Sequence, residues 1–514
     1  MSSKLFKSTA IISVMTLVSR ISGLVRDVVM ANILGPGVLS DAFVVAFRIP
    51  NFLRRIFAEG AFSQAFVPVF SELTEQNTLQ AKKFVNSSAG ILALVTFILS
   101  VLGIIFAPQI VSVLAPGFKS DPEKFAVTVE SLRWMFPYLF CISLVAMSAG
   151  VLNTLNRFAV PAATPVLLNL CLIVAMLFLT PILDHAAQAL AVGVLVAGIL
   201  QLFFQIPSLL KEGFFPSFAI DFKNTAMRRV CTLMLPAIFS VSVVQINMFV
   251  SMVLASRLET GSVSWLYYSD RLMEFPVGVF GIALATVVLP NLSKKHAAGS
   301  SESFSAMLDW ALRWVVLIAV PASLGLYLLA TPLLATIFQH GQFSVRDVQM
   351  SALALQAIAL GVSGFIFIKV LAPGFFAQQD TKTPVKIAVV AVIVNIVLSI
   401  IFVKSMAHVG LALAISISAW VNASLLLIIL IIRKSYKPQS GWLWFILRVA
   451  VAVTAMGFCL YYLTESPEIW FEKSFWQRVL GLALIIAAGV FTYFVVLLGL
   501  GVRPKQLLLS PQHS

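Results

Sequence analysis

The sequence has little charge for its length, and its few cysteines show no pairing pattern. Only 11% of its 514 residues are Asp, Glu, Lys or Arg, whereas 60% are hydrophobic; a soluble domain has about 25% charged residues. The four cysteines all lie in apolar segments without CxxC spacing, which favours buried thiols over a disulfide or a metal site: Cys141, Cys171, Cys231 and Cys459. An ordinary soluble domain and a disulfide scaffold are therefore excluded.

The motifs of several enzyme classes are also missing. The sequence contains no GxxxxGK[ST] loop for nucleotide phosphates, no HExxH helix and no GxSxG elbow. It also has no acidic DDxxD-type cluster that would hold Mg²⁺ for phosphotransfer. An enzyme is therefore the weaker class, and we assign no catalytic residue, metal ligand or cofactor.

Long apolar runs dominate what remains. Many are about 20 residues long, the length at which a helix crosses a ~30 Å hydrocarbon layer, and they lack the alternation of barrel strands. We predict an all-α integral membrane protein with about fourteen transmembrane helices, bent at Pro50 and Pro276. The predicted spans are 8–32, 38–70, 84–107, 128–154, 161–180, 187–207, 230–256, 263–292, 306–330, 348–377, 385–403, 409–432, 441–463 and 478–501.

The basic residues of the connections predict the orientation. With the N-terminus in the cytoplasm, the cytoplasmic segments carry 18 Lys and Arg and the opposite segments carry 6. Cytoplasmic connections are enriched in these residues, so both termini are expected inside. Basic loops beside anionic lipid also explain much of the net charge of +14 without any nucleic-acid partner.

Short sequence matches recur at an offset of 222 or 223 positions in the numbering. Val67–Glu72 resembles Leu289–Lys294, and Asn156–Pro161 lies opposite Gln379–Pro384. Each repeat holds six spans, an even number, so the repeats are parallel; transporters built this way bind substrate between the halves. The predicted domains are an N-terminal six-helix lobe (1–211), a cytoplasmic linker (212–229), a C-terminal six-helix lobe (230–434), and two extra helices with a cytoplasmic tail (435–514).

Twelve charged residues lie deep in these spans. Each costs ~2.5–3.5 kcal/mol at a helix centre if it faces lipid, so they are expected to face one another or a water-filled cavity. The spacing of Asp41, Arg48, Arg55 and Glu59 places them in one helical stripe. The basic members are Arg20, Arg26, Arg48, Arg54, Arg55, Arg271 and Lys369, and the acidic members are Asp27, Asp41, Glu59, Asp270 and Glu274.

The excess of two positive charges in this set predicts an anionic ligand. Arginine suits phosphate because its fork binds two oxygens. In this hypothesis the basic residues of the set are candidates for substrate binding, and the acidic residues Asp27, Asp41, Glu59, Asp270 and Glu274 are candidates for charge pairing or gating. The alternative for each residue is an internal ion pair that only holds the halves together.

Three stretches resemble the MurJ/MviN lipid II flippases. The first is Ser19-Arg20, Gly23, Arg26-Asp27 and Asp41-Ala42-Phe43, followed by Pro50–Phe62 with its Arg-Arg-Ile-Phe-Ala-Glu-Gly-Ala-Phe run; the others are Ser264–Pro276 and Lys369–Phe375. The resemblance covers essentially the whole chain. Position 48 is Arg where Lys is expected in relatives, which makes Arg48 a weaker candidate for a specific contact.

The resemblance implies a fold, a substrate and a location. It implies two six-helix lobes around a central cavity and a final helix pair that forms a lipid-side groove. It implies flipping of undecaprenyl-diphosphate-linked disaccharide-pentapeptide (lipid II) across the bacterial cytoplasmic membrane for peptidoglycan synthesis, with functional roles for Arg20, Arg26, Arg54, Arg271 and Asp41. The cell-wall synthesis machinery is a further expected partner, and membrane potential or a coupling ion is left open as the energy source.

Other functions stay open on the residues alone. A flippase for another polyprenyl-diphosphate-linked glycan would share the diphosphate handle. A drug/cation antiporter of the same superfamily would favour a net-negative cavity, and this set is net positive. A channel would give single-channel currents, a membrane enzyme would release a chemically altered product, and a scaffold would not require twelve deep charges.

Overall fold

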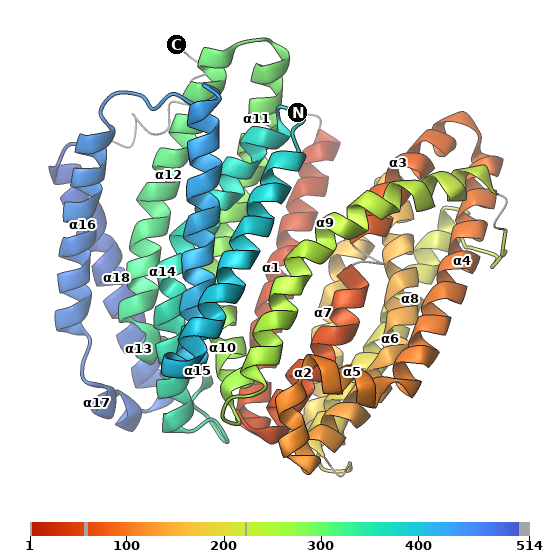
Figure 1. The fold of residues 1–514 in the computed structure, drawn as a ribbon, viewed down its shortest axis with the longest axis horizontal. Helices are drawn as coiled ribbons and strands as arrows, with labels where there is room; N and C mark the ends of the chain where they lie inside the picture. Colours follow the sequence, from red (N-terminus) through yellow and green to blue (C-terminus); the bar gives the residue numbers. More distant parts are fainter. Residues whose placement is uncertain (1–2, 56–59, 184, 222–223, 503–514) are drawn as a thin grey trace. The chain divides into compact units, whose positions relative to one another are not determined.

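The computed structural model describes residues 3–55, 60–183, 185–221 and 224–502, and all regular elements in these ranges are helices. The chain divides into two compact units, Met1–Ser264 and Trp265–Ser514. This confirms the predicted all-α fold, coloured along the chain in Figure 1.

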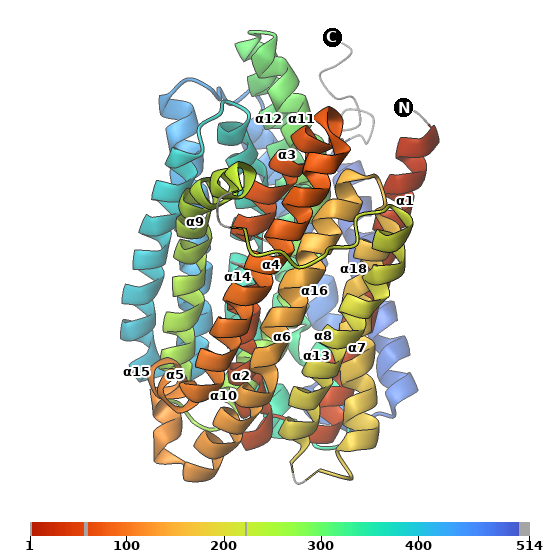
Figure 2. The same ribbon diagram turned by 90° about the vertical axis from the view of Figure 1, so that its right-hand side faces the viewer.

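Unit 1 holds nine α-helices and the start of a tenth among its described residues. The helices α4, α6 and α8 pack side by side, α1 packs on α7, and α9 packs on α3 (Figures 1 and 2). The bounds are α1 (Ser3–Leu34), α2 (Val38–Arg54), α3 (Ala61–Gln76), α4 (Thr78–Ile105), α5 (Ala107–Leu114), η2 (Pro116–Ser120), α6 (Pro122–Thr154), α7 (Ala159–Val174), η3 (Ala175–Leu179), α8 (Ala186–Lys211), α9 (Thr225–Ala255) and the first turn of α10 (Ser262–Pro276).

Unit 2 contains the rest of α10 and the later helices. The helix α14 packs against α11, α12, α13 and α15, and α16 joins α12 to α18 (Figure 1). The bounds are η4 (Val277–Gly281), α11 (Ile282–Ala297), α12 (Ser301–Leu328), α13 (Ala330–Phe338), α14 (Val345–Phe376), α15 (Lys382–Ile432), α16 (Trp442–Leu463), α17 (Pro467–Glu472) and α18 (Phe475–Gly499).

Ten described helical segments are long and apolar enough to cross a membrane: α4, α6, α7 with η3, α8, α10 with η4 and α11, α12, α14, α15, α16 and α18. The predicted set of fourteen adds α1, the α2–α3 pair and α9, and it divides α15 into two spans. That division is present in the structure. Ala407 has φ 48° and ψ −128°, and a Cβ on Gly410 would lie 2.6 Å from the Phe402 carbonyl oxygen. Residues eight apart on a straight helix are about 12 Å apart, so the chain folds back at Ala407.

The helix bounds repeat at the offset seen in the sequence. The helices α4, α6 and α7 begin at Thr78, Pro122 and Ala159, and α12, α14 and α15 each begin 223 positions further along the chain. Asn156 and Gln379, which are separated by the same offset, both have positive φ, at 61° and 59°. Three helix starts and two residues with positive φ share one offset. This agreement indicates a repeated six-span architecture.

The second span of each repeat is interrupted, and the two interruptions are also related by the offset of the repeat. The helix α2 ends at Arg54, with π-type backbone at Arg55 and Gly60. The helix α10 ends at Pro276, and the π-helix η4 follows it. The position of the predicted bend, Pro276, coincides with the change from α-helix to π-helix. Pro50 instead lies inside α2, so this span breaks beyond the proline, after Arg54.

The packing boundary differs from the repeat boundary. By the offset, α9 corresponds to α1 and opens the second repeat, yet it packs on α3, α4 and α5 of unit 1. Contacts therefore divide the chain between Ser264 and Trp265. The predicted domain bounds at 211, 229 and 434 follow the repeat and stay a prediction.

Small residues and stacked rings hold the helices of each unit together. In unit 1, Phe66 stacks on Phe62, Phe70 and Phe84, with ring centroids 5.2, 5.6 and 5.1 Å apart. In unit 2, a Cβ on Gly361 of α14 would lie 2.6 Å from Cα of Ser416 on α15. Such close backbone approach is how spanning helices gain packing energy in lipid, where apolar burial gives none.

The last two long helices are fixed to unit 2 by a buried carboxylate. Asp309 on α12 accepts hydrogen bonds from the Tyr436 hydroxyl, the Gln439 amide and the Trp442 indole N–H, at 2.8, 3.1 and 2.6 Å. Arg313 supplies the countercharge at 2.8 Å. The beginning of α16 is therefore anchored to the beginning of α12, and α18 packs on α16.

Candidate functional site

A buried arginine on α1 is the most enclosed member of the predicted basic set. Arg26 is 8% exposed and Asp27 is 2% exposed. The Arg26 Nε and one terminal nitrogen donate to Asp27 Oδ1 at 3.0 and 2.6 Å, and the other terminal nitrogen donates to Asn169 Oδ1 at 3.0 Å. The predicted pairing role of Asp27 is thus present in the structure.

Asn169 on α7 fixes this arginine from across the helix pair. Its side-chain nitrogen donates to the Ser22 hydroxyl at 2.9 Å and to the Ser19 carbonyl at 3.2 Å. These bonds to α1 orient the amide so that its oxygen faces Arg26. A charged group buried between spans needs such partners on all sides.

The other arginines of unit 1 are less enclosed. Arg20, Arg48, Arg54 and Arg55 are each partly exposed. Arg54 Nε donates to Asn51 Oδ1 at 2.8 Å, one turn back along α2. Glu59, the predicted partner at the end of this stripe, lies outside the described residues, so the full stripe stays a prediction.

Asp41 forms a second buried charge cluster, with a partner that the sequence analysis did not assign. Its carboxylate is 0% exposed. Oδ2 accepts from Lys124 Nζ at 2.7 Å and from the Gly261 amide at 2.8 Å. Oδ1 accepts from the Ser264 amide at 2.9 Å and from the Ser264 hydroxyl at 2.6 Å. Asp41 therefore caps the first turn of α10, and it neutralises Lys124 rather than one of the arginines.

Lys124 is equally enclosed. It is 3% exposed, its Nζ lies 4.3 Å from the Phe118 ring centroid, and it is 3.4 Å from the Thr260 hydroxyl. Ser256 next to this cluster accepts a hydrogen bond from the Gly117 amide at 3.2 Å. Together these contacts fix the α9–α10 connection, residues 256–261, against α2, η2 and α6.

The predicted basic residues of unit 2 lie on α10 and α14. Arg271 donates to Glu274 at 3.0 Å and to the Tyr267 hydroxyl at 3.2 Å, and its guanidinium lies 4.9 Å from the Tyr267 ring centroid. The Glu274 side chain is 60% exposed. Asp270 is partly exposed, and Lys369 is exposed with its stem near Gly281. Glu274 therefore forms an ion pair with Arg271 one turn back along α10.

Among the described residues, ion pairs that involve the predicted set join Arg26 with Asp27, Asp41 with Lys124, and Arg271 with Glu274. Sequence reasoning missed Asn169, Lys124 and Tyr267 as partners. Lys124 belongs to the predicted connection between the spans 84–107 and 128–154, whereas in the structure it lies in the first turn of α6, after the N-cap Asp121. Asn169 is a polar residue inside a charge-free span, which is a usable signal.

Comparisons with known proteins agree over nearly the full chain. A sequence profile described as lipid II flippase MurJ matches residues 30–481. A probable lipid II flippase MurJ of Vibrio cholerae is 43% identical over 514 residues, covering 98% of each chain. A lipid II flippase MurJ of Burkholderia cenocepacia is 44% identical over 458 residues, covering 88% of this chain and 89% of that protein.

Solved structures give the same fold. A lipid II flippase MurJ in an inward closed conformation has a TM-score of 0.80 at 28% identity, covering 94% of this chain and 97% of that one. An inward-facing multidrug resistance MATE family transporter of the MOP superfamily has a TM-score of 0.66 at 16% identity, covering 81% and 94%, a likeness of fold alone. The relatives and the apolar helices together indicate a multi-pass protein of the bacterial inner membrane. Since the profile spans most of the chain and two relatives match it at 43% and 44% identity, this chain belongs to the lipid II flippase MurJ family.

Proposed function

We propose that this chain flips lipid II from the inner to the outer leaflet of the cytoplasmic membrane by alternating access, for peptidoglycan synthesis. The family and its named relatives support this substrate. The observation in the chain itself that carries the proposal is the pair of guanidinium groups on spanning helices, Arg26 on α1 and Arg271 on α10. Lipid II offers the diphosphate that such groups bind best.

The geometry suggests how these arginines would act. Arg26 presents Nε and a terminal nitrogen together to Asp27, and Arg271 presents a terminal nitrogen to Glu274. In our proposal the diphosphate takes the place of these carboxylates during transport, so each guanidinium keeps an anionic partner throughout. The exposed Glu274 exchanges at low cost. The buried Asp27 returns to Arg26 when the lipid leaves, which avoids an unpaired charge inside the protein.

Several parts of the proposal reach beyond the family assignment. We propose that Arg20, Arg54, Arg55 and Lys369 add positive potential along the path, and that the substrate crosses with its covalent bonds unchanged. Both termini would lie in the cytoplasm. Membrane potential or a coupling ion would supply the energy without a bound cofactor, since one elementary charge moving through 100 mV is worth ~2.3 kcal/mol.

The test is a leaflet assay in cells that depend on this chain as their flippase. Wild type and the surface variant Arg229→Ala should restore outward movement of lipid II. Arg26→Ala and Arg271→Ala should reduce it at least tenfold while remaining inserted at normal levels. Arg26→Lys, which keeps the charge but loses the two-pronged donor, should fall in between. Normal flipping by both alanine variants would overturn the arginine mechanism.

The same assay separates the substrate from its alternatives. A failure of the wild-type chain to move lipid II, with another polyprenyl-diphosphate-linked glycan moved instead, would retain the diphosphate chemistry and change the glycan. Export of cationic drugs without lipid movement would favour the antiporter.

A further inference from the structure

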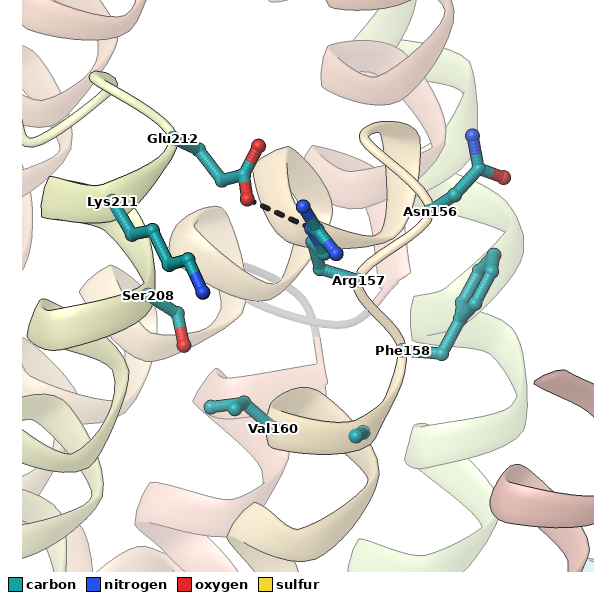
Figure 3. A pocket seen from close by; sticks show the side chains of 8 residues that line it. Asn156, Arg157, Phe158, Val160, Ser208, Lys211 and Glu212 are labelled. Carbon is teal, nitrogen blue, oxygen red and sulfur yellow. Dashed lines mark hydrogen bonds and ion pairs between the residues drawn. The ribbon is translucent and has the colours of Figure 1, made fainter.

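A cavity lies at one end of unit 1, apart from the charge groupings described above. It has a volume of about 290 Å³ and opens between the α6–α7 connection and the last turn of α8. In Figure 3, Ser208 and Lys211 on α8 face the connection that carries Arg157 and Phe158, and Val160 lies below them. It is lined by Asn156, Arg157, Phe158, Ala159, Val160, Ser208, Lys211 and Glu212.

The polar part of this lining carries an excess of positive charge. Arg157 Nε donates to Glu212 at 2.7 Å, so the single carboxylate of the lining is already paired. In the described part of the chain, no carboxylate is within ion-pair distance of Lys211. A third cation lies close by, because a Cβ on Gly213 would be 3.5 Å from Lys82 Nζ.

Backbone donors add to this potential. The helix α7 begins at Ala159, and its N-cap Phe158 provides no side-chain cap. The first N–H groups of a helix have no acceptor within the helix, and its N-terminal end carries partial positive charge. Both Ala159 and Val160 line the cavity, so the helix end and the two basic side chains surround the same space. An oxyanion such as phosphate fits this combination.

Exposed apolar side chains near the cavity favour a lipid headgroup over free phosphate as the ligand. Leu210, beside Lys211, is 57% exposed, and Phe215 and Phe218 just beyond Glu212 are 48% and 59% exposed. The extended segment that carries them is fixed to α4, where the Ser217 amide donates to Asn86 Oδ1 at 2.9 Å. Exposed apolar residues beside basic ones at the end of a span are typical of the lipid headgroup layer.

The second repeat carries a different charge at the corresponding place. At the offset of the repeat, the counterparts of Arg157 and Lys211 are Asp380 and Lys434. Asp380 accepts from Arg433 at 2.6 Å and from the Thr383 hydroxyl at 2.6 Å. The hydrogen bond from the Arg433 side chain, followed in size by the one from Thr383, holds the pKa of the Asp380 carboxyl well below its usual range. The connection therefore keeps a negative charge where unit 1 has a positive one, and Lys434 serves as a matched control.

We propose that the cavity between Arg157 and Lys211 binds the phosphate of an anionic glycerophospholipid, at a site that is not part of the lipid II pathway. Phosphate oxygens would contact Lys211, the Ser208 hydroxyl and the first amides of α7. The glycerol and the beginning of the acyl chains would lie on Phe158 and Val160. The proposed site lies in unit 1 and goes beyond the proposed transport function.

The proposal is tested on the purified full-length chain in detergent, by native mass spectrometry with added lipids. Phosphatidylglycerol should bind more tightly than phosphatidylcholine. Lys211→Ala should weaken phosphatidylglycerol binding about fivefold, the effect of one basic residue on an anionic lipid surface. Lys434→Ala should leave it unchanged, and Lys211→Arg should retain most of it. Lys211→Gln provides a second neutral variant should Lys211→Ala fold poorly.

Three results would overturn this site. Equal loss with Lys211→Ala and Lys434→Ala would show general attraction of lipid to basic ends of spans. Equal binding of phosphatidylglycerol and phosphatidylcholine would exclude recognition of the anionic headgroup. Full displacement of the lipid by millimolar inorganic phosphate would make free phosphate the occupant. None of these results depends on lipid II transport, so the proposed function is tested separately.

Discussion

At the scale of single residues, three buried carboxylates of this protein, those of Asp27, Asp41 and Asp309, each form an ion pair with a nearby basic side chain. Asp41 shows this most completely, because its two oxygens accept four hydrogen bonds from Lys124, Gly261 and Ser264 while no part of it is exposed. The partners come from segments that lie far apart in the sequence. Asp41 therefore has a structural role that its helical spacing alone does not indicate.

Replacing Asp41 should be costly for this reason. Asp41→Asn leaves Lys124 as a buried cation without its carboxylate, and we expect a loss of ~3 kcal/mol in the free energy of unfolding. Chemical denaturation of the detergent-solubilised protein measures this loss. Arg229→Ala, which breaks an ion pair with both side chains about half exposed, should cost less than ~1 kcal/mol.

A double variant separates the charge from the shape. Asp41→Asn combined with Lys124→Met removes both charges, so about half of the lost stability should return. Equal stability of Asp41→Asn and Arg229→Ala would refute the importance of this buried pair.

The residue scale also shows what the sequence could predict. The embedded positions of Arg26, Asp41 and Arg271 follow from charges within apolar runs. The ion pair of Arg271 with Glu274 joins residues three apart on one helix, a short-range contact. Arg26 and Asn169, in contrast, are far apart in the sequence. Such a contact depends on how α1 packs on α7, which local patterns do not encode.

At the scale of elements, the α9–α10 connection is held by close backbone contact as well as by Asp41. A Cβ on Gly117 would lie 2.1 Å from the Ser256 carbonyl oxygen and 2.6 Å from Cα of Arg257. These neighbours are backbone atoms, which cannot rotate away. Only glycine at position 117 therefore allows the connection to pack against η2.

Gly117→Ala should loosen this connection without unfolding unit 1. The added methyl group forces residues 256 and 257 outward, at a cost of ~1–3 kcal/mol. Amide hydrogen exchange of residues 256–264 should become at least tenfold faster, with exchange in α4 and α6 unchanged. Gly325→Ala is the control, since nothing lies within 4 Å of its added Cβ. Unchanged exchange at residues 256–264 would mean that the connection is held by Asp41 alone.

The sequence predicted the helices well where an apolar run forms one continuous helix. It predicted them less well where the helix is interrupted inside such a run. The span predicted at 38–70 is two helices, α2 and α3, and α15 contains two predicted spans. The sequence at the break carries Arg54, Arg55, Glu59 and Gly60. Charges in a span are equally consistent with an unbroken helix that faces a polar cavity, so composition alone does not place the break. The break follows Arg54, which places this arginine at a helix end.

At the scale of the whole molecule, the repeat and the distribution of basic residues predict which connections face the cytoplasm. Ser120 lies in a predicted outside connection, and Ser440 lies in a predicted inside connection. Both side chains are exposed, which makes them suitable for labelling.

Cysteine labelling in intact cells tests this orientation. In a variant whose four native cysteines are replaced, Ser120→Cys should react with a membrane-impermeant maleimide. Ser440→Cys should react only after permeabilisation, because lysines and arginines are retained on the cytoplasmic side. The reverse pattern would place both termini outside and contradict the proposed direction of transport.

The offset between the two six-span repeats changes by one residue along the chain, and the place of this change bears on how the repeats can differ in length. Pro68 and Pro290 are 222 apart, whereas the N-caps Asn77 and Ser300 are 223 apart. The additional residue falls in the turn at Gly299, where φ is +70° and the surroundings are open. Within a helix, one inserted residue would turn every following side chain by about 100° and move buried charges to the lipid face. At Gly299 the two repeats therefore differ in length without changing which side chains of the following helix face the interior.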